Sequence, residues 1–361
     1  MKYPISQIDF HQDFASFVEL SQQIYGEKAV TDEAMYRWLF ANNRYNPQGT
    51  HFFHIAKDGE RVVASDCLLP VPLVIHGQRF LAAWSVKTMT HPSYQRQGIF
   101  KAMTEYNISR ARELGIDLIL GFANANSFPG YKKFGWDILF ERRAVVRPLD
   151  IKRSLAKRKL FKPFALIGNT LYQAYDRKRI SALRKKTGEF SAEILPAAPD
   201  CIQEIWAKME AAVPMLIERD WAYLNWRYNQ RPRQDYKFVL AREEGKPEAM
   251  LIFRTSAVNS SCIIIDYIGA PKSRALPALF SKTIDYCLQK DIRYLINSSS
   301  SLFDNHLIKN FGFKHLAAPM ANNMFIACRL NDAIDLDSLH EETNWFFSYG
   351  DSELDIDLQP S

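Results

Sequence analysis

The sequence predicts a mixed α/β protein built from two domains, and three observations lead to this prediction. Its 361 residues exceed the roughly 100–200 residues of one typical domain. Strand and helix patterns alternate along the first half, and short blocks of that half recur in the second. Recurrence of the same pattern in the same order is expected of a duplicated domain.

The first half opens with two helical patterns and continues with β-rich runs. Apolar residues recur at helical spacing in the early segments, whereas the later runs are rich in β-branched and aromatic residues. Short turns that contain Gly59 and Gly77 separate these runs and predict two hairpins. The expected elements are helices at Phe14–Tyr25 and Ala34–Phe40 and strands at His51–Ala56, Val62–Val71, Leu73–His76 and Phe80–Thr90.

After Pro92 the hydrophobic period changes from that of a strand to that of a helix. Ile99, Met103 and Tyr106 share one helical face, and Gly115 ends the helix. The strands on either side of this helix should be parallel, because parallel neighbours need such a crossover. The remaining expected elements are a helix Ile99–Leu114, a strand Ile116–Phe122, a short helix Ser127–Phe134 and a closing strand Ile138–Val146.

Three blocks of the first half recur in order in the second half. The pairs are Tyr36–Leu39 with Trp221–Leu224, Phe53–Ala56 with Phe238–Ala241, and Lys133–Trp136 with Asn310–Phe313. The change in spacing between them requires only a shorter loop, so an internal duplication is expected. The expected organisation is a first domain at 1–150, a basic helical linker at 151–188, a second domain at 189–331 and an acidic tail at 332–361.

The net charge of +6 conceals two oppositely charged segments. Residues 141–186 carry 15 Lys or Arg and 3 acids, while the acidic tail carries 9 acids and no Lys or Arg. The basicity is therefore local and does not indicate a general nucleic-acid surface. Three interpretations of the basic linker stay open: connecting helices that lie on the domains, a helix on an anionic membrane surface, and a docking strip for the acidic tail. The complementary charges favour an association of linker and tail within the chain.

Composition and cysteine usage limit the class of protein. Apolar residues make up 47% and charged residues 24% of the chain, which is ordinary for a globular protein and excludes a collagen-like or disordered chain. The five cysteines form no CxxC pair, so no disulfide framework or metal site is expected and a cytoplasmic location fits best. The start lacks the apolar core of a signal peptide, and no uncharged apolar run reaches the roughly 18 residues of a transmembrane helix.

One loop suggests chemistry. Residues 95–100 join a strand directly to a helix, whose first N–H groups are free to bind an anion. Gly98 lets the backbone approach a ligand closely, because no Cβ intervenes. Arg96 and Lys101 add positive charge. This arrangement suits a diphosphate.

At these residues the sequence resembles the GCN5-related N-acetyltransferase (GNAT) superfamily. The acyl-CoA loop of that superfamily is Gln/Arg-x-x-Gly-x-Gly/Ala, and this chain matches it at Gln95 and Gly98 but has Phe100 at the last position. A second motif also matches, since Asn124 is followed after six residues by Tyr131 and then Gly135-Trp136. The resemblance implies two GNAT-like domains with acetyl-CoA as acyl donor. The cofactor-binding residues it implies are Met89, Thr90, Gln95, Arg96, Gln97, Gly98, Ile99, Phe100, Lys101 and Asn124.

The second half lacks the Gly98-type loop, and the position equivalent to Tyr131 is Ile308. It therefore resembles a degenerate GNAT-like domain, whose expected role is to wall a cleft for the acceptor. The blocks W-x-Y-L-N-W-R-Y and TMTHP-x-Y resemble bacterial tandem GNAT proteins of cell-surface polysaccharide biosynthesis. That resemblance implies a small amine acceptor, such as an amino sugar or sugar nucleotide.

Candidate catalytic residues follow from direct attack of an amine on a thioester. Tyr131 could protonate the leaving thiolate, or could be a core tyrosine. His91 is the nearest base able to act at neutral pH, although it could merely cap a strand. Asp66 is a weaker candidate base, and a water relay is an alternative. Asn124 could bind pantetheine or only initiate a helix, and a backbone N–H in 89–91 could hold the carbonyl oxygen.

Two other function classes compete with an N-acetyltransferase. A Fem-like transferase that uses aminoacyl-tRNA would employ the basic linker to hold RNA, but it would not need the acyl-CoA loop. A non-catalytic acyl-CoA-binding protein would fit the lack of an acid in 85–90. Acyl transfer to a small amine remains the first hypothesis, with a nucleic-acid partner not expected.

Overall fold

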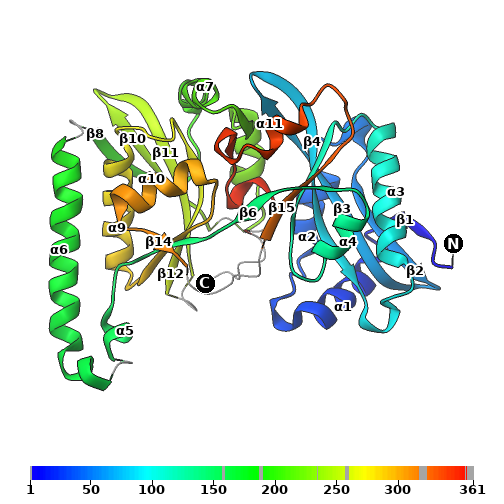
Figure 1. Ribbon diagram of the computed structural model, residues 1–361, viewed down its shortest axis with the longest axis horizontal. Helices are drawn as coiled ribbons and strands as arrows, with labels where there is room; N and C mark the ends of the chain where they lie inside the picture. Colours follow the sequence, from blue (N-terminus) through cyan, green and yellow to red (C-terminus); the bar gives the residue numbers. More distant parts are fainter. Residues whose placement is uncertain are drawn as a thin grey trace.

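The chain folds into two mixed α/β lobes, each built around its own sheet (Figure 1). The computed structural model describes residues 2–156, 159–186, 190–233, 235–256, 260–316, 323–353 and 355. The predicted mixed α/β class is confirmed. Among the described helices, none is both long enough and apolar enough to cross a membrane.

The first sheet has nine strands, seven of which form one continuous path in the order β1-β2-β3-β4-β5-β15-β6. Only β4 and β5 are parallel along this path, as the predicted crossover requires. The strands are β1 Ile5–Gln7, β2 Phe52–Asp58, β3 Arg61–Ile75, β4 Gln78–Thr90, β5 Leu118–Ala123, β15 Asn323–Arg329 and β6 Asp137–Arg142, with β9 Met215–Ile217 and β16 Trp345–Phe346 attached beside β3.

The second sheet has seven strands and repeats the plan of the first. Its order is β8-β10-β11-β12-β13-β7-β14, and only β12 and β13 are parallel neighbours. Along its path, each sheet therefore has its parallel contact between the fourth and fifth strands. The strands are β8 Phe190–Leu195, β10 Lys237–Glu243, β11 Lys246–Ser256, β12 Ser261–Ile268, β13 Tyr294–Asn297, β7 Val145–Pro148 and β14 Lys314–His315.

The two lobes exchange strands within their main sheet paths. β15 from the second half lies between β5 and β6 of the first sheet, and β7 from the first half lies between β13 and β14 of the second. The expected single strand Ile138–Val146 is wrong, because β6 and β7 occupy different sheets. Sheet membership also crosses the expected boundaries at 150 and 331. Strand patterning specifies which face is buried but not which partner a strand pairs with, so the exchange was not visible in the sequence.

The helices repeat as well. Both α2 and α8 continue directly into a π-helical turn, and the two turns meet where Trp38 Nε1 donates to the Trp226 carbonyl at 3.0 Å. Two of the three recurring sequence blocks occupy equivalent positions: Phe53–Ala56 and Phe238–Ala241 lie in β2 and β10, and the glycines of the last pair, Gly135 and Gly312, both have a left-handed φ. The pairing of Tyr36–Leu39 with Trp221–Leu224 is wrong by three residues, because α2 and its π-helical turn align with α8 and its turn so that Trp38 corresponds to Trp226. The helices are α1 Phe14–Tyr25, α2 Glu33–Tyr36, α3 Ile99–Glu113, α4 Phe128–Lys133, α7 Ile202–Ala212, α8 Trp221–Leu224, α9 Leu276–Gln289 and α10 Ser301–Phe311.

One hairpin differs from expectation. The runs Val62–Val71 and Leu73–His76 were expected as separate strands, but β3 continues through Pro70 and Pro72 as one strand of 15 residues. Its pairing with β4 extends over almost this whole length. Both prolines pair with β4 on one side, while the pairing with β2 ends at Leu68 and that with β9 begins at Leu73. The strand continues through them because proline favours the extended φ.

The basic linker is helical, as predicted, and consists mainly of α5 (Lys152–Ala156) and α6 (Ala165–Lys186). α6 packs against α9 at the outer edge of the second lobe (Figure 1). The expected docking of the acidic tail on this linker is wrong for the buried carboxylates Asp351 and Asp355. They bind Arg219 and Arg227 between the lobes instead.

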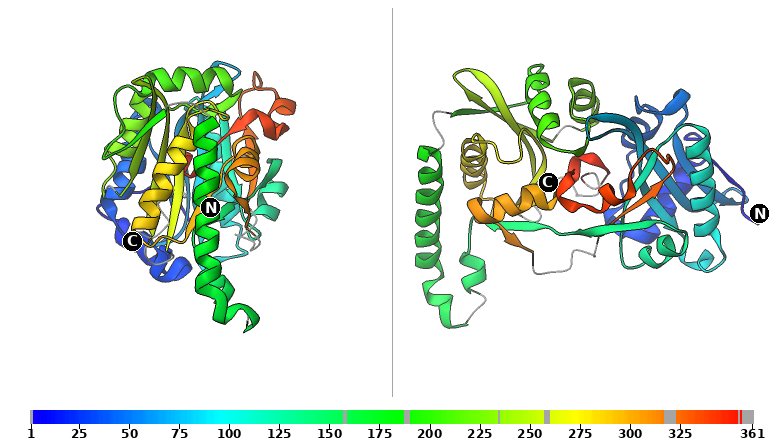
Figure 2. Two further views of the ribbon diagram at one scale, coloured as in Figure 1. Left: turned by 90° about the vertical axis from the view of Figure 1, so that its left-hand side faces the viewer. Right: turned by 45° about the horizontal axis from the view of Figure 1, so that its top comes forward.

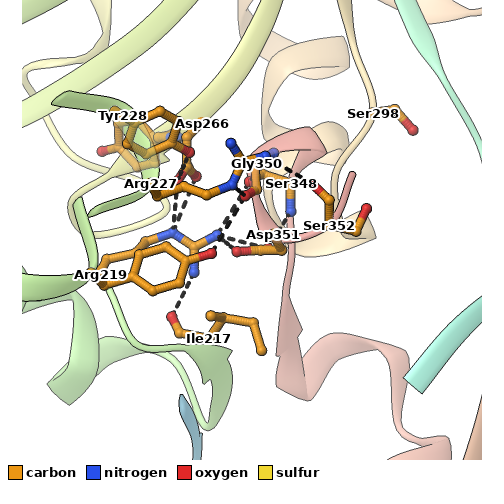
Figure 3. Close-up of polar contacts among 12 residues, drawn as sticks. Ile217, Arg219, Arg227, Tyr228, Asp266, Ser298, Ser348, Gly350, Asp351 and Ser352 are labelled. Carbon is orange, nitrogen blue, oxygen red and sulfur yellow. Dashed lines mark hydrogen bonds and ion pairs between the residues drawn. The ribbon is translucent and has the colours of Figure 1, made fainter. Parts of the chain in front are cut away.

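Two buried arginines anchor the acidic tail (Figure 3). Arg219 Nη2 donates to Asp351 Oδ1 at 2.7 Å, and its Nε donates to Asp266 Oδ1 at 3.1 Å. Arg227 donates to the Gly350 carbonyl at 2.8 Å. A buried charge is tolerated only when it is paired. Asp351 and Asp355 therefore belong to the core, and their charges are neutralised there by arginines that lie far from them in the sequence.

Candidate active site

The site begins where β4 and β5 separate. The two strands pair only from Ala82–Ser85 and Leu118–Gly121, although both continue further. Beyond this point β4 carries a bulge opposite Asp66, and Lys87 in the bulge has a left-handed φ of 52°. A bulge bends the strand and changes the direction in which the following side chains point. The result is a V-shaped opening between parallel strands that continues to the start of α3.

A cavity of about 670 Å³ lies in this opening. Seven of the ten predicted cofactor-binding residues line it: Thr90, Gln95, Arg96, Gly98, Ile99, Phe100 and Lys101. Five further residues line the cavity and were not predicted from the sequence: Thr88, Tyr94, Asn126, Ser127 and Phe134. Strand alternation would have indicated Thr88, because side chains two residues apart on a strand share a face.

One end of the cavity is built to bind an anion. Gly98 precedes the first turn of α3 with a φ of 80°, and Arg96 has a φ of 62°. The first N–H groups of α3 therefore face outward without helical partners, at the positive end of the helix dipole. Arg96 and Lys101 line the same end. These groups fit the diphosphate of a CoA molecule.

Phe100, where the motif has a small residue, is accommodated by a glycine opposite. Its ring contacts Tyr131 edge-on at 5.2 Å between ring centres. A Cβ at Gly130 would lie only 2.4 Å from Phe100 Cε1. The large side chain at 100 thus depends on the missing side chain at 130. This departure from the motif changes the wall of the cavity and leaves the α3 N-terminus in place.

The other end of the cavity holds a chain of hydroxyl groups that leads to a buried carboxylate. The hydroxyl of Tyr131 lies 3.0 Å from Ser85 Oγ and 3.1 Å from Thr88 Oγ1. Thr88 Oγ1 donates to Asp66 Oδ1 at 2.8 Å. Asn107 holds this part of β3 in place, because its Nδ2 donates to the Asp66 carbonyl at 2.9 Å. Thr88 lines the cavity, so its hydroxyl connects the cavity with the buried carboxylate of Asp66.

Burial controls the protonation of both ends of this chain. Desolvation raises the pKa of Asp66 to about 6, although the hydrogen bond from Thr88 opposes the rise. Burial, with the charge of Asp66 adding to it, raises the pKa of the Tyr131 hydroxyl well above its ordinary value. Near neutral pH the chain therefore contains a protonated phenol and a carboxylate close to its titration point.

Three predicted cofactor-binding residues do not line the cavity. Met89 is buried on the opposite side of β4 from Thr88 and Thr90. Gln97 turns toward the N-terminus, where its Oε1 accepts from the Tyr3 hydroxyl at 2.8 Å. Asn124 Oδ1 accepts from the backbone N–H groups of residues 126 and 127, which is the helix-initiating role.

His91 is also held away from the cavity. Its Nδ1 accepts from the Ser93 N–H at 3.1 Å, and its Nε2 lies 2.9 Å from Arg61 Nη2. Partial burial, together with the charge of Arg61, lowers its pKa. The His91 N–H donates to the Val63 carbonyl at 2.9 Å. Since N–H groups alternate along a strand, the N–H of Thr90 points the other way, into the opening.

The acidic tail reaches this site. Glu353 is nearly buried, and its charge contributes to raising the pKa of both Tyr131 and Cys67. The described part of the tail thus runs from the anchor between the lobes to the neighbourhood of Tyr131. A carboxylate near Tyr131 was not expected from the sequence, because more than 200 residues separate the two positions.

The tail also fills the corresponding part of the second lobe. β12 and β13 pair only from Ser261–Ile263 and Tyr294–Ile296. The tail turn Tyr349–Asp351 packs on β12 beyond this pairing, and a Cβ at Gly350 would lie 1.9 Å from the Tyr228 hydroxyl. The second lobe therefore uses its strand opening to hold the tail.

Comparison with known proteins agrees with the predicted resemblance. Residues 7–139 match the family model of the acetyltransferase (GNAT) domain. This stretch contains the Gly98 loop, Asp66, Thr88 and Tyr131. The chain has no match among curated proteins.

Solved structures with the same fold cover nearly the whole chain. A probable N-acyltransferase from Enterococcus faecalis V583 has a TM-score of 0.61 at 13% identity and covers 91% of this chain and 73% of its own. A GCN5-related N-acetyltransferase from Anabaena variabilis has a TM-score of 0.60 at 13% identity with the same coverage. One from Kribbella flavida has a TM-score of 0.57 at 14% identity, covering 90% of this chain and 70% of its own. The two-lobed fold is therefore a GNAT-type fold.

Proposed function

We propose that this protein is an acyl-CoA-dependent N-acyltransferase that transfers an acyl group, acetyl in the simplest case, to the amine of a small molecule. The main support is the cavity, which has an anion-binding helix N-terminus at one end and a chain of hydroxyl groups at the other. Either feature alone would fit many proteins. Their position at the two ends of one strand opening fits a long donor whose phosphates and reactive group are bound separately.

The anion-binding end would hold the donor. The N–H groups around Gly98 and the cations Arg96 and Lys101 would bind the diphosphate. Lys101 is only loosely engaged elsewhere, at 3.7 Å from Glu105. Acyl-CoA would supply an activated thioester. The N–H of Thr90, which points into the opening, would donate to the carbonyl oxygen as negative charge develops there.

The chain of hydroxyl groups would transfer the protons that the reaction releases and consumes. An attacking amine must lose a proton, and Thr88 can accept it while passing its own proton to Asp66. A carboxylate with a pKa of about 6 is mostly ionised at neutral pH yet basic enough to take part. The Tyr131 phenol, kept protonated by burial, would donate to the departing sulfur. The geometry favours Asp66 over His91 as base, because Asp66 connects to the cavity through one hydroxyl.

The acceptor that we propose is an amino sugar or a sugar nucleotide. Support comes from the sequence resemblance of the W-x-Y-L-N-W-R-Y block at 221–228. Its residues Trp226, Arg227 and Tyr228 are buried between the lobes, so the block positions the lobes and does not contact the acceptor through these side chains. The acceptor therefore has to be found by assay.

A two-stage experiment tests this function. Thermal unfolding is measured with acetyl-CoA, CoA and, as a control, adenosine 3′,5′-bisphosphate. Stabilisation by the first two is expected, and no stabilisation by any CoA compound would refute the proposal. Release of free thiol is then followed with a panel of aminated sugars and nucleotides. Acetyl-CoA binding without turnover on any amine would instead favour the non-catalytic acyl-CoA-binding protein.

Tyr131→Phe separates chemistry from binding. The variant should bind acetyl-CoA as the wild type does and lose about 100-fold in turnover, in line with removal of a general acid. Tyr94→Phe is the matched control, since Tyr94 lines the cavity but its hydroxyl bonds to Asp58 at the exposed end and takes no part in the hydroxyl chain that links Tyr131 to Thr88. Equal turnover in both variants would remove Tyr131 from the mechanism.

A further inference from the structure

The outer face of the basic linker carries an unusual concentration of exposed apolar side chains. Seven large apolar residues of the described chain are well exposed, and five of them lie between 164 and 175. They belong to α6 and the residue before it, at the end of the molecule farthest from the N-terminal lobe (Figures 1 and 2). These five are Phe164, Leu166, Ile167, Leu171 and Tyr175.

Four of these residues share one face of the helix. Phe164, Ile167, Leu171 and Tyr175 follow one another at intervals of three or four residues, which places them in one row. The exposed fractions of Ile167, Leu171 and Tyr175 are 61%, 66% and 66%. Ile180 and Ala165 lie on the opposite face, are buried, and turn toward the protein. The apolar row is therefore additional to the face with which α6 packs on α9.

Positive charge surrounds this row. Residues 151–186 contain twelve Lys or Arg and one acid. Lys162, Arg177, Lys178 and Lys185 are exposed. The single acid, Asp176, is buried and bound by Arg147. The surface thus combines apolar side chains with cations that no acid on the same segment neutralises.

We propose that this face binds peripherally to an anionic lipid bilayer, with α6 lying along the surface. Apolar side chains that insert at the level of the headgroups, flanked by Lys and Arg that contact anionic lipids, are characteristic of helices of this kind. A second copy of the chain fits less well, because two strongly positive faces repel. RNA would use the charge but would leave Ile167 and Leu171, at the centre of the row, without an apolar partner. The charge complementarity therefore selects the lipid surface.

Vesicle co-sedimentation tests this inference independently of acyl transfer. The full-length protein should bind vesicles of phosphatidylcholine mixed with phosphatidylglycerol, should not bind phosphatidylcholine alone, and should be released by salt. Leu171→Ser with Tyr175→Ser should weaken binding by about tenfold or more. Ile24→Ser removes an exposed apolar side chain of the other lobe (37% exposed) and should leave binding unchanged.

Several outcomes would overturn the proposal. Equal binding by the double serine variant and the Ile24→Ser control would show that the α6 row does not contact lipid. Absence of binding to anionic vesicles, with a dimer in light scattering that the double variant dissociates, would assign the face to a second copy. Salt-sensitive binding of RNA but not of vesicles would assign it to a nucleic acid. Because the substituted residues are exposed, unchanged thermal unfolding confirms that each variant is folded.

Discussion

Replacement of Asp66 by Asn should stabilise the protein while impairing its chemistry. Asp66 is fully buried, and its pKa is about 6 against 3.8 for an ordinary aspartate. A raised pKa means that ionisation of Asp66 is penalised in the folded state only. The penalty is absent below pH 3.8, grows between 3.8 and 6, and is complete above that range. Removal of the charge should therefore increase the free energy of unfolding most at neutral and alkaline pH.

The size of the effect follows from the two pKa values. Near pH 7.5 the penalty is about 3 kcal/mol, and near pH 5 it is about 1.6 kcal/mol. The asparagine amide can still accept from Thr88, but its NH₂ group must find new acceptors, which offsets about 1 kcal/mol. A net gain of about 2 kcal/mol near pH 7.5 is expected, falling to below about 1 kcal/mol near pH 5. Urea unfolding at the two pH values measures both quantities.

Asp304→Asn provides the matched control. Asp304 lies in the second lobe, is fully buried, and also has a pKa raised to about 6 by burial. It accepts from Asn297 and Ser299 and does not line the cavity. Its substitution should show a similar pH dependence of stability with no change in acyl transfer. Asp66→Asn should reduce turnover about 100-fold and remove the rise of activity with an apparent pKa near 6. An unchanged pH–activity profile, or equal destabilisation at both pH values, would refute the reasoning.

Three further substitutions test separate parts of the structure. Gly98→Ala should weaken CoA binding about tenfold, because alanine is strained at the left-handed φ of this position. Gly77→Ala is the control: Gly77 has a φ of 78° in a distant turn, so its substitution should lower the stability about as much as Gly98→Ala does and leave the CoA affinity measured by titration unchanged. Gly130→Ala should destabilise the protein by about 1–3 kcal/mol through its clash with Phe100, and Phe100→Ala in the same chain should restore most of the loss in thermal unfolding. Arg219→Met should destabilise the protein by about 3–5 kcal/mol, because the buried carboxylates of Asp266 and Asp351 lose their partner. Asp351 has a pKa of about 6 and is mostly protonated near pH 5, so urea unfolding should show a smaller loss of stability at that pH.

The loop and the cavity were the most predictable parts of the site. Gly98 combines a strand end, a helix start and a left-handed φ, and all three depend on neighbouring residues. Of the five missed lining residues, strand alternation would have indicated Thr88. The other four lie in the turn after β4 and beside the two ends of α4, so their place in the wall depends on how distant segments meet. Asp66 and Thr88 lie 22 residues apart in the sequence but bond at 2.8 Å, because the bulge in β4 changes the register. A register shift has no reliable pattern in a single sequence.

The fate of the charged segments depended even more on long-range contacts. The spacing of apolar residues predicted the helical linker, and the number of lysines and arginines in it showed its positive charge. Complementary charge alone favoured its pairing with the acidic tail, but the described tail binds Arg219 and Arg227. Buried arginines must be paired, whereas Arg177, Lys178 and Lys185 of α6 are exposed and can remain hydrated. Burial, which the sequence does not reveal, decided between them.

The sequence by itself determined the class of fold, the repeat of its elements, the helix start at Gly98 and the positions of the charged segments. These properties arise from hydrophobic period, turn residues and local spacing, which act over a few neighbouring residues. Only the tertiary structure decided that β7 and β15 exchange sheets, that Asp66 meets Tyr131 through Thr88, and that the tail closes the space between the lobes. Those choices depend on which strand edges and buried charges are satisfied together, and that is a property of the whole fold.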